Sequence, residues 1–183
     1  RNSWGYTEDN DYKTANEIIC DLVDIVSKNG CLLLNIGPKG DGSIPEEDKK
    51  LLLEIGDWLK INGQAIYDSK VWRYASEGPT KVSEGQFSDT TSKKFTPKDI
   101  RYTVNNNAIY ATVLNYPENG QVKLTSFAKK DPCFVPCFHG IIKDIVALGF
   151  DEKIKWNHST DALEISTTTI QSELPVVFKI ILD

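Results

Sequence analysis

Two groups of acidic side chains are the first residues in this sequence whose types could do chemistry. They are Glu8, Asp9, Asp11, Glu46, Glu47 and Asp48. A pair of facing carboxyl groups can act as a nucleophile and a general acid/base. We interpret the first group as solvated loop residues, and the second as first-turn charges that complement the positive end of a helix. No catalytic residue is therefore assigned to this chain.

Cys133, Cys137 and His139 could ligate a metal ion. A Cys-x-x-x-Cys spacing without a fourth ligand is a poor zinc signature, so a disulfide or free thiols is the preferred interpretation. We expect no metal and no cofactor. Asp41, between two glycines, is expected to close a turn with its side chain. Asn157-His158-Ser159 matches the N-glycosylation sequon, which matters if the source is a eukaryote that secretes the protein.

The overall composition is that of a globular protein. The chain has 183 residues, of which 40% are hydrophobic and 26% charged, with a formal net charge of −5. A net negative charge does not favour a basic face that could neutralise phosphates, so nucleic acid is not expected as a partner. The longest apolar runs fall far below the roughly 18 residues needed to span a bilayer, so no membrane partner is expected. Since the chain contains no Met and opens without a signal segment, it is expected to be a piece of something longer.

The first third of the chain predicts a helix, a buried strand and a second helix. Thr14-Ala15-Asn16-Glu17 is a capping box, and apolar residues at spacings of three and four follow it, so a helix is expected over about 15–28. Residues 31–37 are short and apolar, as in a strand covered on both faces. Pro45 fits the first turn of the next helix, which is expected to end at Asn62-Gly63.

One buried strand between two helices cannot form a sheet alone, because both of its edges would expose unpaired backbone groups. The remaining strands must lie upstream. If the parent sheet is a closed (β/α)8-like barrel, which takes roughly 250 residues, this chain carries its last helix-strand-helix.

The second half predicts an antiparallel β-sandwich. A hairpin pattern flanks Asn105-Asn106-Asn107, with strands over 100–104 and 108–114. Further strands are expected over 121–126, 141–147, 153–156, 162–166 and 176–182. The fold class is therefore α/β plus all-β, with barrel residues 1–72, a linker over 73–94 and a sandwich over 95–183.

Several motifs resemble one family in order and spacing. Residues 27–38, 40–45 and 54–63 resemble the end of the catalytic barrel of α-L-fucosidases of glycoside hydrolase family 29, and Ser3-Trp4-Gly5-Tyr6 matches a motif that precedes them. Residues 95–103 and 108–111 look like the opening strands of the family's C-terminal sandwich. Cys31 departs from the family's usual Asn, and the 131–140 loop is unlike the short turn expected there.

The resemblance implies a retaining exo-hydrolase that removes terminal α-L-fucose, with an Asp nucleophile and a Glu acid/base expected upstream of Ser3. Such carboxyl groups lie about 5 Å apart. The implied partners are a fucosylated glycan and the upstream barrel portion, and a homo-oligomer is left open. This chain alone is expected to be inactive. The implied location is secreted, periplasmic or lysosomal.

Trp4 is the one candidate substrate-binding residue. By resemblance its ring helps to line the pocket for the C5 methyl group of fucose; the alternative is a Trp packed in a barrel loop. Asn35, near the end of the expected strand, is interpreted as a buried structural support for a neighbouring loop.

Two other functions are weighed for the sandwich. One is a non-catalytic carbohydrate-binding module, which would need Tyr102, Tyr110 and Tyr116 on one face. The other, preferred for the sandwich by itself, is a structural support that covers barrel helices and sets oligomer contacts.

Overall fold

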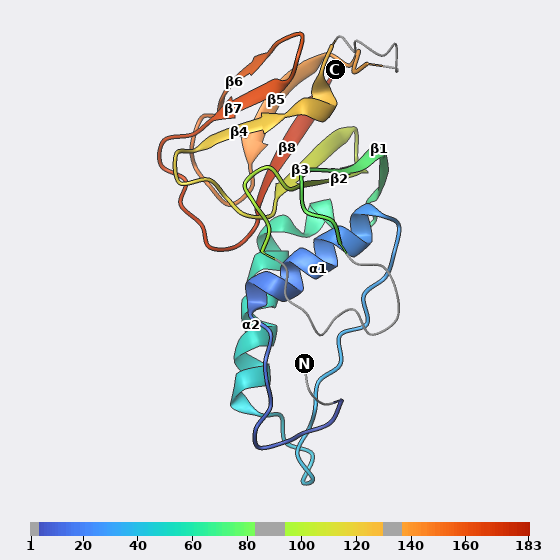
Figure 1. Cartoon of the computed structure of the whole chain (residues 1–183), viewed down its shortest axis with the longest axis vertical. Helices are drawn as coiled ribbons and strands as arrows, with labels where there is room; N and C mark the ends of the chain where they lie inside the picture. Colours follow the sequence, from blue (N-terminus) through green and yellow to red (C-terminus); the bar gives the residue numbers. More distant parts are fainter. Residues whose placement is uncertain (1–3, 83–93, 130–136) are drawn as a thin grey trace.

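A computed structural model of the chain describes residues 4–82, 94–129 and 137–183, and two helices precede eight strands in these residues. The strands form two sheets at one end of the molecule, and α1 (Ala15–Ser27) and α2 (Glu46–Asn62) lie beneath them (Figure 1). Neither helix is long and apolar enough to cross a bilayer, within the residues that the structure describes.

Both predicted helices are confirmed. The Thr14 hydroxyl accepts from the Glu17 amide at 3.2 Å, and the Thr14 amide donates to the Glu17 carboxylate at 2.8 Å, so the capping box is complete. α1 ends before Asn29, whose φ of 66° supplies the left-handed residue expected at Asn29-Gly30. α2 follows Pro45 and continues into a 3₁₀ turn over Gly63–Ala65.

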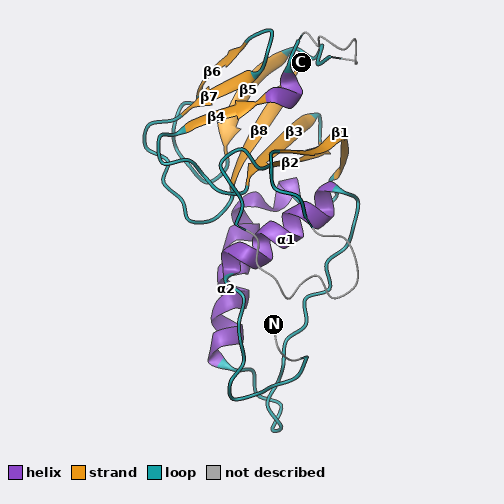
Figure 2. Ribbon diagram, viewed as in Figure 1, coloured by secondary structure: helices purple, strands orange, loops and turns teal. Residues whose placement is uncertain are grey.

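The predicted buried strand over residues 31–37 is not formed in this chain. The segment has no strand assignment, and Leu33 is 93% exposed. A parallel strand needs neighbours on both edges, and no other described segment pairs with it. The described residues also contain no closed barrel. Residues 28–45 run as an extended loop beyond α1 (Figure 2).

The antiparallel sandwich is confirmed. One sheet has the order β1-β2-β3-β8-β5 and the other β4-β7-β6. The strands are β1 (Lys70–Glu77), β2 (Ile100–Asn105), β3 (Ala108–Val113), β4 (Gln121–Leu124), β5 (Ile142–Ala147), β6 (Lys155–His158), β7 (Leu163–Ser166) and β8 (Val176–Leu182). A 3₁₀ turn over Thr125–Phe127 shortens the strand predicted over 121–126. All pairings are antiparallel.

The central strands of the five-stranded sheet are covered on both faces, which makes the fold three-layered. In β3, Ile109 and Ala111 face the other sheet, whereas Ala108 and Tyr110 pack with the helices. Ile19 of α1 belongs to the same second cluster. Since side chains alternate along a strand, a strand buried on both faces is nearly all apolar, and β3 is buried at every position with Thr112 as its one polar residue.

Strand β1 lies partly where the sequence predicts a linker over 73–94. The first sheet therefore begins before that segment, at Lys70. The register between β1 and β2 shifts between Val71 and Ser76, and this irregularity breaks the period-two pattern by which strands are predicted. Residues 83–93 lie outside the described residues.

Candidate functional site

Trp4 lies on an open loop, and its side chain is 86% exposed. The Asn35 amide donates to the Trp4 carbonyl at 2.7 Å, which ties this loop to the segment after α1. The supporting role predicted for Asn35 is thus confirmed, but its predicted burial is wrong, since Asn35 is exposed in this chain. No described residue buries the indole of Trp4, so both of its faces are available for a ligand or for a segment not described.

Gly37 brings the two segments into backbone contact. A Cβ atom at this position would lie 2.7 Å from the Gly5 carbonyl carbon and 2.7 Å from the Tyr6 amide nitrogen. Real Cβ atoms do not approach backbone so closely, so any side chain at Gly37 would push the Trp4 loop away. Sequence reasoning missed this residue. The signal was a glycine directly after an apolar run, which can mark a close backbone approach.

The loop after Gly37 is held by a local turn. The Asp41 carboxylate accepts from the Ser43 amide at 2.9 Å and from the Ser43 hydroxyl at 2.7 Å. The hydrogen bond from the Ser43 hydroxyl is the main cause that lowers the pKa of Asp41. Asp41 is therefore a turn residue, as predicted. Lys39, at the start of this turn, places its ammonium 5.5 Å from the centre of the Tyr6 ring.

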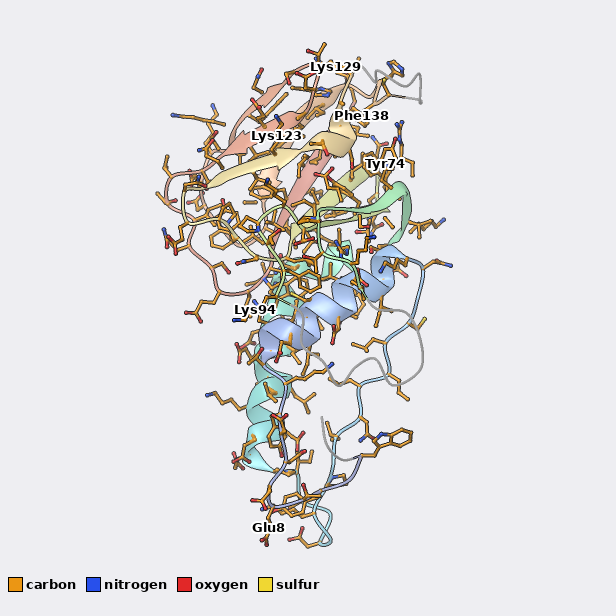
Figure 3. All side chains as sticks on the ribbon, in the orientation of Figure 1. Glu8, Tyr74, Lys94, Lys123, Lys129 and Phe138 are labelled. Carbon is orange, nitrogen blue, oxygen red and sulfur yellow. The ribbon has the colours of Figure 1, made fainter. Side chains whose placement is uncertain are left out.

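The acidic residues do not form a catalytic pair in the described structure. Glu8 lies at the far tip of the molecule (Figure 3), and Glu46 and Glu47 are exposed in the first turn of α2. Asp48, also in that turn, is buried and accepts from the Tyr12 hydroxyl at 3.2 Å. Asp48 therefore joins the N-terminal segment to α2, which is more than the surface charge predicted for it.

The cysteine loop is only partly described. Cys133 lies outside the described residues, and the Cys137 carbonyl accepts from the Arg73 guanidinium at 3.0 Å. Among residues with described positions, no group of three His, Cys, Asp or Glu side chains could hold a metal ion. Cys20 is buried under the sheet, and this burial raises its pKa to about 12, so it is an unreactive thiol.

The three tyrosines considered for a sugar platform are core residues. Tyr102, Tyr110 and Tyr116 are 0%, 1% and 8% exposed. Tyr110 packs toward the helices, and the other two lie between the sheets. These residues cannot form an exposed aromatic face, because all of them are covered by the fold.

Comparison with protein families gives two consecutive matches. The Alpha-L-fucosidase model matches residues 1–64, and the Alpha-L-fucosidase C-terminal domain model matches residues 92–181. The tissue α-L-fucosidase of Rattus norvegicus is 36% identical over 181 residues, which are 97% of this chain and 33% of that protein. The human tissue α-L-fucosidase is 38% identical over 162 residues, which are 87% of this chain and 29% of that protein.

The fold agrees with solved structures. The Thermotoga maritima α-fucosidase in complex with fucose is 26% identical, with a TM-score of 0.72 over 97% of this chain and 37% of that one. The chain thus spans about a third of the length of the curated relatives it matches. Because the matches run in the same order as the Trp4 loop, the helices and the sandwich described above, the chain belongs to the α-L-fucosidase family, and it includes that family's C-terminal domain.

Proposed function

We propose that the protein of which this chain is part hydrolyses terminal α-L-fucose from glycoconjugates or oligosaccharides, with retention of configuration. The observation that carries this proposal is the pair of fucosidase matches, which together cover residues 1–64 and 92–181. The nucleophile Asp and the acid/base Glu come from the upstream part of the barrel. Residues 1–72 belong with that barrel, and this chain alone is inactive.

Within this proposal, Trp4 recognises the apolar side of the sugar. An indole face suits the C5 methyl group of fucose and the carbon-bound hydrogens of the ring. The exposure of Trp4 supports this role, and so does the way its loop is held. The side-chain amide of Asn35 donates to the Trp4 backbone carbonyl, and Gly37 allows the two backbones to come into contact. Both contacts use backbone atoms of residues 4–6 and leave the indole ring unoccupied.

The sandwich has a structural role in the proposed enzyme. The outer face of its five-stranded sheet packs on α1 and α2, and the Trp58 indole donates to the Pro175 carbonyl at 2.9 Å. The Thr103 hydroxyl donates to the Ala65 carbonyl at 2.8 Å. These contacts favour a support for the last barrel helices over a separate carbohydrate-binding module.

We place the enzyme in a secretory or lysosomal compartment.

The test is hydrolysis of an aryl α-L-fucoside by the enzyme with the upstream portion present, and by this chain alone. Activity should require the upstream portion. Activity of this chain alone would overturn the placement of the catalytic carboxylates, and inactivity of the whole enzyme on every fucoside would overturn the function.

Trp4 is tested by its contribution to sugar discrimination. L-Galactosides differ from L-fucosides by a hydroxyl group on the C5 substituent, so the methyl contact is the feature to measure. Trp4→Ala should lower kcat/KM for the fucoside by about 10- to 100-fold, as for a lost apolar contact, and should lower it less for the L-galactoside. Trp4→Phe should restore part of the preference. Equal losses on both substrates would assign Trp4 to packing.

A further inference from the structure

Strand β6 is an edge strand of the smaller sheet, since it pairs only with β7 among the described strands. Trp156 pairs with Ile165, a residue of the core between the sheets, so its neighbour Asn157 points to the outer face. Asn157 is exposed there, opposite Glu164. Two surface hollows of about 590 and 490 Å³ adjoin this strand, and Trp156 and Asn157 line both of them.

We propose that Asn157 carries an N-linked glycan. Asn157-His158-Ser159 is an acceptor sequon, and it is the single Asn-x-Ser/Thr sequence without proline at the middle position in these 183 residues. A sequon is informative only where its asparagine is accessible, and this asparagine lies on the outer face of an edge strand. No hydrogen bond of its side chain amide to a described residue would be lost on modification.

The chemistry is a transfer of one oligosaccharide. The Asn157 side-chain nitrogen bonds to the anomeric carbon of a lipid-pyrophosphate-linked oligosaccharide donor, the bond from that carbon to the pyrophosphate oxygen breaks, and one proton leaves the amide. The donor and its transferase belong to the eukaryotic secretory pathway. The proposal therefore rests on the secretory location proposed above, but it does not rest on any catalytic property of the enzyme.

The structure also indicates when the transfer occurs. The Ser159 hydroxyl donates to the Ala162 carbonyl at 3.1 Å and accepts from the amides of Asp161 and Ala162 at 3.3 and 3.2 Å. His158 is held as well, because its ring nitrogen bonds to the Phe127 carbonyl at 2.7 Å. The sequon is thus locked into the β6–β7 hairpin once that hairpin closes. The glycan must be added before this part of the chain folds.

A glycan at this position has a physical consequence. It would cover the outer side of β6 and the hollows beside Trp156, and bulky polar groups on an edge strand oppose pairing with another chain. Lys129 already protects one β6 carbonyl, since its ammonium donates to the His158 carbonyl at 2.8 Å. The sandwich end that carries β6 lies opposite the loop region near Glu8 (Figures 1 and 3), so the glycan would lie at the other end of this chain from that loop region.

The experiment uses the enzyme containing this chain, purified from a eukaryotic secretory host together with a secreted reporter that has a known sequon. Treatment with peptide N-glycosidase in H₂¹⁸O should convert Asn157 to Asp with one ¹⁸O, as read by peptide mass spectrometry. Asn157→Gln should abolish the glycan, and Ser159→Thr should keep it. A secreted enzyme with unmodified Asn157 beside a glycosylated reporter would overturn the proposal.

Two further arms separate glycosylation from folding and from activity. Ser159→Ala removes the acceptor hydroxyl but also three turn contacts, so Asn157→Gln is the variant that tests glycosylation without disturbing the turn. For the timing, a transferase preparation with its lipid-linked donor should modify a peptide of residues 153–163 and leave the folded, unglycosylated enzyme unmodified. Equal modification of both would overturn the order of events. An inactive but glycosylated enzyme would contradict the fucosidase proposal alone.

Discussion

Arg101 and Asp24 form a buried ion pair that joins β2 to α1. Their side chains are 3% and 8% exposed, and the Arg101 guanidinium donates to the Asp24 carboxylate. Lys28 contacts the other carboxylate oxygen of Asp24 at 2.7 Å, and the Arg101 guanidinium also donates to the Ile100 carbonyl at 3.0 Å. Each charge is therefore compensated, which is the condition under which burial of ions is tolerated.

We expect Arg101→Met to lower the free energy of unfolding by about 3 kcal/mol, because the buried Asp24 carboxylate loses its buried partner and keeps only the half-exposed Lys28. Urea unfolding of the enzyme checks this. The control is Lys60→Met, which removes an exposed pair with Asp57 and should cost less than about 1 kcal/mol. If Asp24→Leu/Arg101→Met is less stable than Arg101→Met, the loss comes from packing and not from the uncompensated charge.

Glu152 gives a prediction about pH. Hydrogen bonds from Thr169 and Thr168, the hydroxyl of Thr169 foremost, lower its pKa from the ordinary 4.5 to about 2. A carboxyl whose pKa is lower in the folded state stabilises the fold above its unfolded pKa, and this contribution is lost as pH falls. Between pH 4.5 and about 2, the native protein should therefore lose Tm faster than Glu152→Gln.

The matched control for this pH effect is Glu118→Gln, because the structure shows no hydrogen bond from Glu118 to another described residue and Glu118 is exposed. Its Tm should follow that of the native protein over the same pH range. Parallel curves for the native protein and Glu152→Gln would show that the two threonines do not stabilise the charged form.

At the scale of elements, the β2–β3 hairpin depends on two left-handed residues. Asn106 and Asn107 have φ values of 46° and 59°, and Asn105 pairs with Ala108 on either side of them. Positive φ at both central positions is typical of the type I′ turn, whose twist matches that of the strands. In this left-handed conformation the Cβ atom of most residues lies too close to the backbone, which costs stability. Gly has no Cβ atom and avoids this cost, and Asn and Asp tolerate the conformation better than other residues.

We therefore expect Asn106→Ala to lower stability by about 1 kcal/mol, whereas Asn106→Gly should leave it nearly unchanged. Thermal unfolding of the two variants measures the difference. The pair is well matched because the structure shows no hydrogen bond of the Asn106 side chain to a described residue. Equal Tm values for the Ala and Gly variants would contradict the assignment of the loss to backbone conformation.

Elements with complete local signals were predictable from the sequence. The capping box at Thr14 and the Asn-rich turn after Asn105 each satisfy their backbone groups with residues close in sequence, so no distant partner is needed. The segment 31–37 carries a strand signal that only partner strands can realise. β1 was missed because its irregular register hides the alternation.

The candidate site was predictable only in part, for a related reason. Trp4 could be proposed from its motif, and Asn35 from its polar character in an apolar run. The contact of Gly37 with Gly5 and Tyr6 joins backbones more than 30 positions apart, and composition alone does not encode such a contact. The packing of the helices on the sheet was in reach of the sequence, because β3 is nearly all apolar and a strand of that kind is covered on both faces, but the pattern does not say which helix residues contact it.

At the scale of the whole molecule, large apolar side chains are exposed in the region near residues 31–53. Leu33, Leu34, Ile44 and Leu53 are all exposed. Apolar side chains that gather on one part of a surface mark contact with another part of a protein. In the proposed enzyme, the upstream barrel strands cover residues 31–37, so the isolated chain and the complete enzyme should respond oppositely to a charge placed there.

Leu33→Lys tests this difference. In the isolated chain it should reduce self-association, measured by sedimentation velocity, since it replaces an exposed leucine with a charge. In the complete enzyme it should lower the free energy of unfolding by at least about 2 kcal/mol, because the leucine would there be buried and the lysine would leave an unpaired charge. Ile141→Lys is the control, since Ile141 is exposed on the sandwich, away from the proposed barrel contact. It should leave the stability of the complete enzyme unchanged, and an equal effect of both substitutions there would refute the barrel contact of residues 31–37.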